Sequence, residues 1–276
     1  RREGRPQALF ASVRDVYPSF SDAQVLAWVE DLRTTGVDVH TEIARLNNEL
    51  GALRQRLDQW VLEAAPGGLQ EERRYFRRCL IDCWQRRVTV GVNNILAPQS
   101  FRFAIFAAVP GNLPELPAQV RFAHVFELAL LGMQLDDIPV AFLATFPNLR
   151  ILELSGNRLS RVPAAIAQMP DLNELDLFNN RIVLDPEQAG ILAGCRSLQY
   201  LNLSFNPLGR GFSLRALNRL RRLHMRGTGQ TELPPGVLSC PDLLQADLRD
   251  NLIATLPASY HRAPVWARRS LIPVSY

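Results

Sequence analysis

Apolar and polar positions in the second half of the chain follow one repeated line. Apolar residues stand at its first, fourth, sixth and eleventh places and asparagine at its ninth, at 149–159, 172–182 and 198–208. Looser copies begin at Val125, Leu220 and Leu243, so the first places are 24, 23, 26, 22 and 23 residues apart. Alternating apolar and polar positions within each copy predict a short strand with one buried face.

Six copies of this line at this spacing are typical of leucine-rich repeats. Stacked repeats bury a continuous core and place a parallel sheet on the concave side of a solenoid. The ninth-place asparagines turn the chain inside the core, where an unpaired amide would cost roughly 1–3 kcal/mol. We expect a ladder of Asn157, Asn180, Asn206 and Asn251, with local irregularity where Met133 and Thr228 replace asparagine.

Residues 1–90 predict an N-terminal α-helical bundle. Ser21 and Gln24 form a capping box that starts one helix, and Gly36 ends it. A second helix carries an apolar seam with heptad spacing, formed by Ile43, Leu46, Leu50, Leu53, Leu57 and Trp60. A third helix follows residues 66–68. Its apolar side is expected to hold Tyr75, Phe76, Cys79, Leu80, Cys83 and Trp84, and its polar side Arg73, Arg74, Arg77, Arg78, Arg86 and Arg87.

The whole chain therefore predicts an α/β fold, a leucine-rich-repeat solenoid preceded by an α-helical bundle. Residues 91–124 are expected to cap the open end of the solenoid with a degenerate strand around Phe103 and Ile105. The six repeats occupy residues 125–256. In the longest repeat, between the copies that begin at Leu172 and Leu198, Asp185 and Pro186 predict the start of a helix. Residues 257–276 form a C-terminal edge that Tyr260, Val265 and Trp266 are expected to seal.

Composition adds two points to this picture. The chain lacks an initiator methionine, a signal peptide and an apolar run of about 18 residues, so we expect a soluble fragment of a longer protein. All 31 basic residues are arginine and none is lysine. A GC-rich genome that favours arginine codons explains this bias, and so does selection against ubiquitin acceptor amines beside ubiquitin machinery.

No known catalytic constellation occurs in the sequence. CxxC pairs, HExxH, a phosphate-cradling glycine loop and a nucleophile elbow are all absent, and the four histidines are scattered. Cys79 and Cys83 are one helical turn apart, which suits a metal or a reactive thiol, but their apolar neighbours favour packing. Cys195 and Cys240 stand where other repeats place core residues. We expect no catalytic residues, cofactor or metal in this chain.

The outward strand positions supply a candidate protein-binding face. They run from acidic through aromatic to basic, the mixture expected of an interface. The candidate residues are Glu127, Glu153, Glu174, Asp176, Phe178, Tyr200, Asn202, Arg222, His224, Arg226, Asp247 and Arg249. An ordinary polar solenoid surface is the alternative.

The arginines of residues 73–87 invite a different interpretation, docking on an anionic membrane or on nucleic acid. The interpretation favoured here is a solvated helix face partly paired by Glu71, Glu72 and Asp82. Nucleic acid is not expected as a partner.

Several runs resemble one protein family. They are residues 46–53 (LNNELGAL), Asp58–Gln59–Trp60, residues 83–87 (CWQRR), Phe146–Pro147–Asn148–Leu149 and residues 203–209 (LSFNPLG). They look like the leucine-rich-repeat region of bacterial NEL-type effectors, the novel E3 ligases that include the IpaH and SspH proteins. The resemblance implies a secreted effector in the host cytoplasm, whose repeats recognise a host protein. It further implies a downstream domain that transfers ubiquitin through a cysteine thioester and that the repeats can hold inactive. A ubiquitin-conjugating enzyme would contact that domain only.

The chain also departs from this family. The family's catalytic Cys-x-Asp follows the repeats, whereas this chain reaches Tyr276 without one. Cys79 and Asp82 have the wrong spacing and precede the repeats, so the role is not transferred to them. Repeats of 22–26 residues are longer than is usual in the family, which favours its larger dermonecrotic-toxin-like branch. Alternative functions are a non-catalytic toxin or adhesin scaffold and a basic-helix membrane-docking module.

Overall fold

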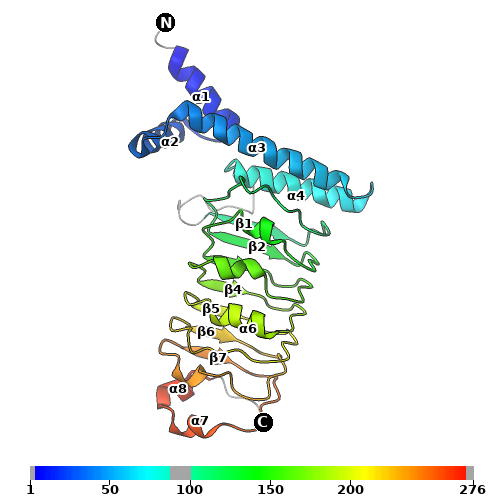
Figure 1. The fold of residues 1–276 in the computed structure, drawn as a ribbon, viewed down its shortest axis with the longest axis vertical. Helices are drawn as coiled ribbons and strands as arrows, with labels where there is room; N and C mark the ends of the chain where they lie inside the picture. The colour runs from blue at the N-terminus through cyan, green and yellow to red at the C-terminus, as the bar shows by residue number, and fades with distance from the viewer. Residues whose placement is uncertain (1–3, 88–100, 272–276) are drawn as a thin grey trace.

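The computed structural model describes residues 4–87 and 101–271, so the predictions for residues 1–3, 88–100 and 272–276 lie outside the described residues. Four helices come first: α1 (Gly4–Val16), α2 (Asp22–Thr35), α3 (Val39–Leu62) and α4 (Gly68–Trp84). Figure 1 shows α3 and α4 lying side by side across one end of a stack of strands, with α1 and α2 beyond α3. The helical region is thus docked on the solenoid.

The helices form where the local signals place them. Ser21 accepts a hydrogen bond from Gln24 N, Gln24 reciprocates, and Gly36 ends α2 in the left-handed conformation, which confirms both predicted caps. All six residues of the predicted seam on α3 are buried.

One prediction for α4 is wrong. Tyr75 is 42% exposed, whereas Arg73 is only 9% exposed. The Arg73 guanidinium donates to Pro110 O (2.9 Å) and Trp60 O (2.6 Å) and lies over the Trp60 ring. Buried backbone carbonyls need donors, and a long guanidinium reaches two of them at once, so tertiary contacts override the apolar period.

Within the described residues, seven parallel strands form one sheet in chain order. They are β1 (Arg102–Phe106), β2 (Glu127–Leu131), β3 (Ile151–Glu153), β4 (Glu174–Asp176), β5 (Tyr200–Asn202), β6 (Arg222–His224) and β7 (Gln245–Asp247). Residues at the same place in successive repeats are direct register partners, as Leu152, Leu175 and Leu201 show. These leucines are fully buried, so the stacked repeats share the continuous core that one repeat cannot form.

Short helices return the chain on the opposite side. These are α5 (Val140–Leu143), the 3-10 helix η1 (Ala164–Gln168), α6 (Pro186–Ala193) and the 3-10 helix η2 (Val237–Ser239). Asp185 caps α6 by accepting from Gln188 N, and Pro186 opens the helix as predicted. Phe142, Ile166 and Val237 are buried in the core from this side.

The asparagine ladder is present. Asn206 donates to Leu177 O (2.8 Å) and Leu203 O (3.0 Å) and accepts from Ile182 N (3.1 Å), so one amide ties two repeats together. The expected irregularity at Thr228 is wrong, because its hydroxyl donates to Met225 O and its repeat keeps strand register. At Met133, which is fully buried, the neighbouring Asn157 accepts from the Met133 and Leu135 amides and register again continues.

Both ends of the sheet are covered. At the first end, β1 pairs with β2 over its whole length, and Phe103 and Ile105 are buried. At the other end, α7 (Ala258–Arg262) and α8 (Val265–Arg269) precede a bridge of Leu271 to Ala246. Val265 and Trp266 were expected to seal this end, but both are more than half exposed. Since α8 turns Ala267 inward, that residue is buried instead.

Candidate functional site

The solvent side of β1–β7, here called the sheet face, carries every predicted binding residue on or just beyond a strand. Parallel register sorts the strand positions into rows. One row runs Arg102, Glu127, Ile151, Glu174, Tyr200, Arg222 and Gln245, and the next runs Ala104, Ala129, Glu153, Asp176, Asn202, His224 and Asp247. Residues about 24 apart in sequence are thus neighbours across the sheet, at strand spacings of about 4.8 Å.

The acidic end of the face is partly neutralised. Arg102 forms ion pairs with Glu153 (2.9 Å) and Glu127 (3.7 Å). Partial burial and the nearby Glu127 and Glu153 carboxylates raise the pKa of Glu174. Sequence reasoning missed Arg102 because β1 was treated only as a cap. Glu174 is therefore the exposed carboxylate that this end presents to a partner.

Asp176 and Asn202 carry a structural task as well as a predicted binding one. Asp176 accepts from Phe178 N (2.9 Å) and Asn202 accepts from Ser204 N (3.0 Å), which turns the chain at the end of each strand. Burial raises the pKa of Asp176. Substituting either residue would therefore alter the turn together with any partner contact.

The basic end differs most from the prediction. Asp247 is only 5% exposed and binds the Arg249 guanidinium through both oxygens, at 2.9 and 2.8 Å, so it does not face a partner. These hydrogen bonds lower the pKa of Asp247. Arg249 follows Asp247 by two residues, just beyond the end of β7, so its guanidinium reaches both carboxylate oxygens. Arg226 pairs with Asp250 at 2.5 Å, whereas Arg222 is exposed without an ion pair among the described residues.

Aromatic side chains occupy the middle of the face. Phe178 and Phe205 meet edge to face with ring centroids 5.5 Å apart, and both are partly exposed, by 37% and 43%. Tyr200 lies 5.4 Å from the His224 ring and accepts from Asn202 Nδ2. The Arg226 guanidinium lies 5.9 Å above the Phe205 ring. We call Phe178, Tyr200, Phe205 and His224 the aromatic centre.

Phe205 is held in an unusual backbone conformation. The place just before the ladder residue has a positive φ in all six repeats: Gly132, Gly156, Asn179, Phe205, Gly227 and Asp250. Glycine, asparagine and aspartate tolerate that conformation, but a bulky residue there costs roughly 1–2 kcal/mol. Backbone strain of this kind concentrates at functional sites. Sequence reasoning missed Phe205, although comparing this one place across the repeats would have revealed it.

Gly227 makes room for the Phe205 ring. A Cβ at Gly227 would lie 3.0 Å from the ring, closer than ordinary contacts allow. The backbone of the next repeat at Gly227 therefore packs directly against the exposed Phe205 ring. A ring that is supported on one side and open on the other is a preorganised contact surface.

The cysteines pack in the core, as predicted. All four cysteines are buried as free thiols, and burial raises the pKa of Cys195 to about 11. Within residues 4–87 and 101–271, no group of three or more histidine, cysteine or acidic residues is arranged to hold a metal ion. No helix in that part of the chain is long and apolar enough to cross a membrane.

Comparison with known proteins agrees with the repeat architecture. A leucine-rich-repeat family model matches residues 124–182, and a second matches residues 194–210. Over 146 residues, half of this chain, the sequence is 30% identical to leucine-rich repeat-containing G-protein coupled receptor 5 of Rattus norvegicus. Over 139 residues, 48% of this chain, it is 36% identical to human podocan-like protein 1. The chain spans only 15% and 25% of these relatives' lengths.

Two of the solved structures that match this chain are bacterial proteins. A leucine-rich-repeat protein of Leptospira interrogans is 30% identical, with a TM-score of 0.44, 53% of this chain covered and 37% of that one. Internalin C2 of Listeria monocytogenes is 22% identical, with a TM-score of 0.37, 56% of this chain covered and 72% of that one. The family-model matches and the seven-stranded parallel sheet together define a leucine-rich-repeat domain, which is a protein-interaction module.

Proposed function

We propose that the sheet face recognises a protein partner through its aromatic centre. The observation that carries this proposal is the exposed Phe205 side chain. Its backbone is in the left-handed conformation, and the other five repeats have glycine, asparagine or aspartate at this position. Aromatic anchors near the middle of an interface, ringed by polar groups, supply most of the energy in protein recognition. Glu174 on one side and Arg222 on the other would set the orientation of the partner.

We further propose that the parent protein is a secreted NEL-type E3 ubiquitin ligase effector, acting in the host cytoplasm. The runs at residues 46–53, 83–87 and 203–209 support this origin, and so does the complete absence of lysine. In that setting the repeats would select a host protein for ubiquitylation by the downstream domain. They would also hold that domain inactive until the host protein binds.

A pull-down from host-cell lysate tests the recognition surface. The chain is compared with a variant carrying Phe178→Ala and Phe205→Asn, and captured proteins are read by mass spectrometry. Val140 and Leu252 are exposed apolar residues outside the aromatic centre, so Val140→Ala with Leu252→Ala is the matched control. A protein captured by the chain and the control but lost by the aromatic variant supports the proposal. Equal capture by all three refutes it.

The ligase proposal has a separate test. This chain, added in trans to the isolated downstream domain of the parent, should suppress ubiquitin chain formation, and the captured host protein should relieve the suppression. Chain formation that is unaffected at every concentration would rule out the autoinhibitory contact. A downstream domain that forms no thioester with ubiquitin would rule out the ligase itself, and would leave recognition by the sheet face untouched.

A further inference from the structure

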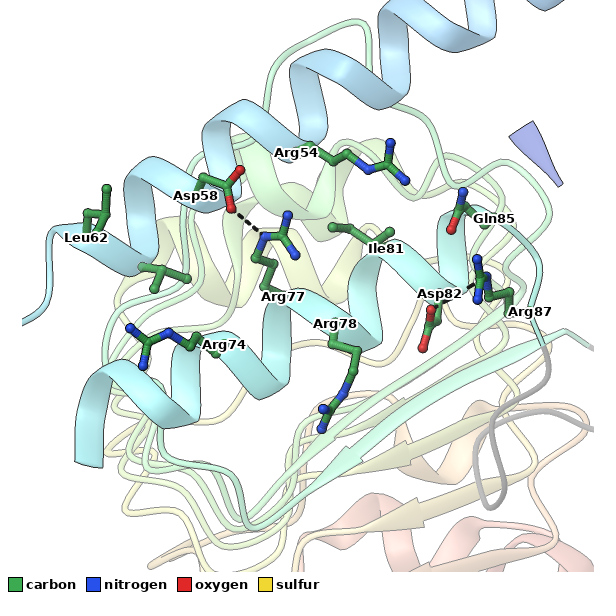
Figure 2. Close-up of a pocket in the computed structure, with 11 residues that line it drawn as sticks. Arg54, Asp58, Leu62, Arg74, Arg77, Arg78, Ile81, Asp82, Gln85 and Arg87 are labelled. Carbon is green, nitrogen blue, oxygen red and sulfur yellow. Dashed lines mark ion pairs between the residues drawn. The ribbon is translucent and has the colours of Figure 1, made fainter. Parts of the chain in front are cut away.

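A second surface lies on the helical region, between α3 and α4. Helices α3 and α4 border a cavity of about 790 Å³ (Figure 2). Val61 and Ile81 form its apolar floor and are buried, whereas Leu62 stands at its edge with 74% of its surface exposed. The other side of α4 faces the solenoid, where Phe76 packs against Phe142. The cavity therefore forms a groove that the repeats do not fill.

Arginines surround this floor. Arg54 comes from α3, Arg74, Arg77 and Arg78 come from α4, and Arg87 follows α4, while Asp58 and Asp82 are the acidic residues of the lining. Figure 2 shows the Arg77 guanidinium directed at Asp58, and the two are 2.7 Å apart. Arg74 pairs with Glu71 and Arg87 with Asp82 as well, so the excess positive charge of the groove lies on Arg54 and Arg78.

Two of the arginines are unengaged by acidic groups. Arg54 and Arg78 are exposed, and neither has an ion pair among the described residues. Arg78 instead lies over the Tyr75 ring, with 5.5 Å from the guanidinium to the ring centre. Arg74 and Arg78 are one turn apart, about 6 Å along α4. Guanidinium groups at this spacing match carboxylates one turn apart on a bound helix.

We propose that the α3–α4 groove binds an acidic amphipathic helix of a partner protein. Its carboxylates would pair with Arg54 and Arg78, next to Arg74, which Glu71 already holds, and one apolar side chain would rest on Val61 and Ile81 beside Leu62. This is the helix-in-groove mode of recognition, in which apolar contacts give affinity and flanking charges give register. A planar membrane would meet the rim of the groove and leave its floor unused. Phosphates of nucleic acid would gain nothing from the apolar floor.

Direct binding of a defined probe tests the proposal. The probe is a fluorescent, helix-forming peptide with glutamates one turn apart and leucine on the same face. Its comparison peptide has glutamine at each glutamate. Fluorescence anisotropy with the whole chain should give at least tenfold tighter binding of the glutamate peptide, and that difference should shrink as salt is added.

Variants locate the site. Arg54→Gln with Arg78→Gln should weaken binding of the glutamate peptide at least tenfold, and Leu62→Ser should weaken it about threefold. Arg181→Gln with Arg196→Gln removes two exposed arginines from the repeats and should change binding by less than twofold. Circular dichroism confirms that each variant is folded.

Three results would overturn the proposal. The first is equal weakening by the two double variants, which would mean attraction to net charge alone. The second is an affinity for the glutamate peptide that neither Leu62→Ser nor removal of leucine from the peptide changes, since the groove would then not bind an apolar side chain. The third is no binding of the peptide while anionic phospholipid vesicles or duplex DNA bind in a way that depends on Arg54 and Arg78.

Discussion

Glu49 joins the helical region to the solenoid, and its removal gives a sharply defined stability prediction. The side chain is 4% exposed. Its Oε1 accepts from Trp84 Nε1 at 2.9 Å and from the Arg121 amide at 2.8 Å, while Oε2 binds Arg45 at 2.8 Å. One carboxylate thus connects α3, α4 and the segment between β1 and β2.

The magnitude follows from which partners are left unpaired. Glu49→Ala leaves the Trp84 and Arg121 donors without an acceptor, at roughly 1–3 kcal/mol each, so we expect a loss of about 3–5 kcal/mol. Glu49→Gln keeps an oxygen for both donors and loses only the ion pair with Arg45, whose side chain is 55% exposed. That variant should cost about 1–2 kcal/mol, the range for a hydrogen bond to a charged group that is partly screened by solvent. Glu42→Gln removes the other carboxylate on Arg45 and should cost at most about 1 kcal/mol.

Urea unfolding measures these differences. Three of the four tryptophans, Trp28, Trp60 and Trp84, belong to the helical region, whereas Trp266 lies on α8. Tryptophan fluorescence therefore reports mainly on the helical region, and far-UV circular dichroism reports on the whole chain. The unfolding free energies are compared between variants whose m-value, the slope of the free energy with urea concentration, is unchanged. The reasoning fails if Glu49→Ala costs less than about 1 kcal/mol, or if Glu49→Gln costs as much as Glu49→Ala.

Three further predictions concern single residues. Burial and Arg86 lower the pKa of His124 to about 3, so below pH 6.5 the unfolded chain binds a proton that the folded chain does not. Stability should fall by up to about 1.4 kcal/mol per pH unit from pH 6.5 towards pH 3, and His124→Gln should remove that part of the slope in urea titrations at several pH values. Asn206→Ala should cost about 2–4 kcal/mol, against less than about 1 kcal/mol for the exposed Asn148→Ala; similar losses would show that the ladder is unimportant. Phe205→Asn should change the unfolding free energy by less than about 1 kcal/mol, because relief of backbone strain offsets the lost ring contact; a large loss would make Phe205 a packing residue.

The sequence by itself determined the repeat architecture. Alternation with period two decides which strand residues face inward, so Leu152, Leu175 and Leu201 could be assigned to the core without a structure. Capping at Ser21, Gly36 and Asp185 is equally local, since the groups that bond lie within one turn of each other. Interactions over such short distances along the chain can be predicted from neighbouring residues in the sequence.

Only the tertiary structure decided which polar groups meet. Arg73 is buried and Tyr75 exposed because carbonyls from α3 and the cap need donors, and nothing near residue 73 in sequence shows that need. Asp247 binds Arg249 rather than facing a partner. The Phe205 ring packs against Gly227 of the next repeat, where a side chain would collide with it. The groove between α3 and α4 likewise exists only once the two helices are paired. Apart from Asp247 and Arg249, which are two residues apart, these contacts join residues that are distant in sequence. Packing decides which of them meet and which way each side chain points, and a one-dimensional pattern does not encode that geometry.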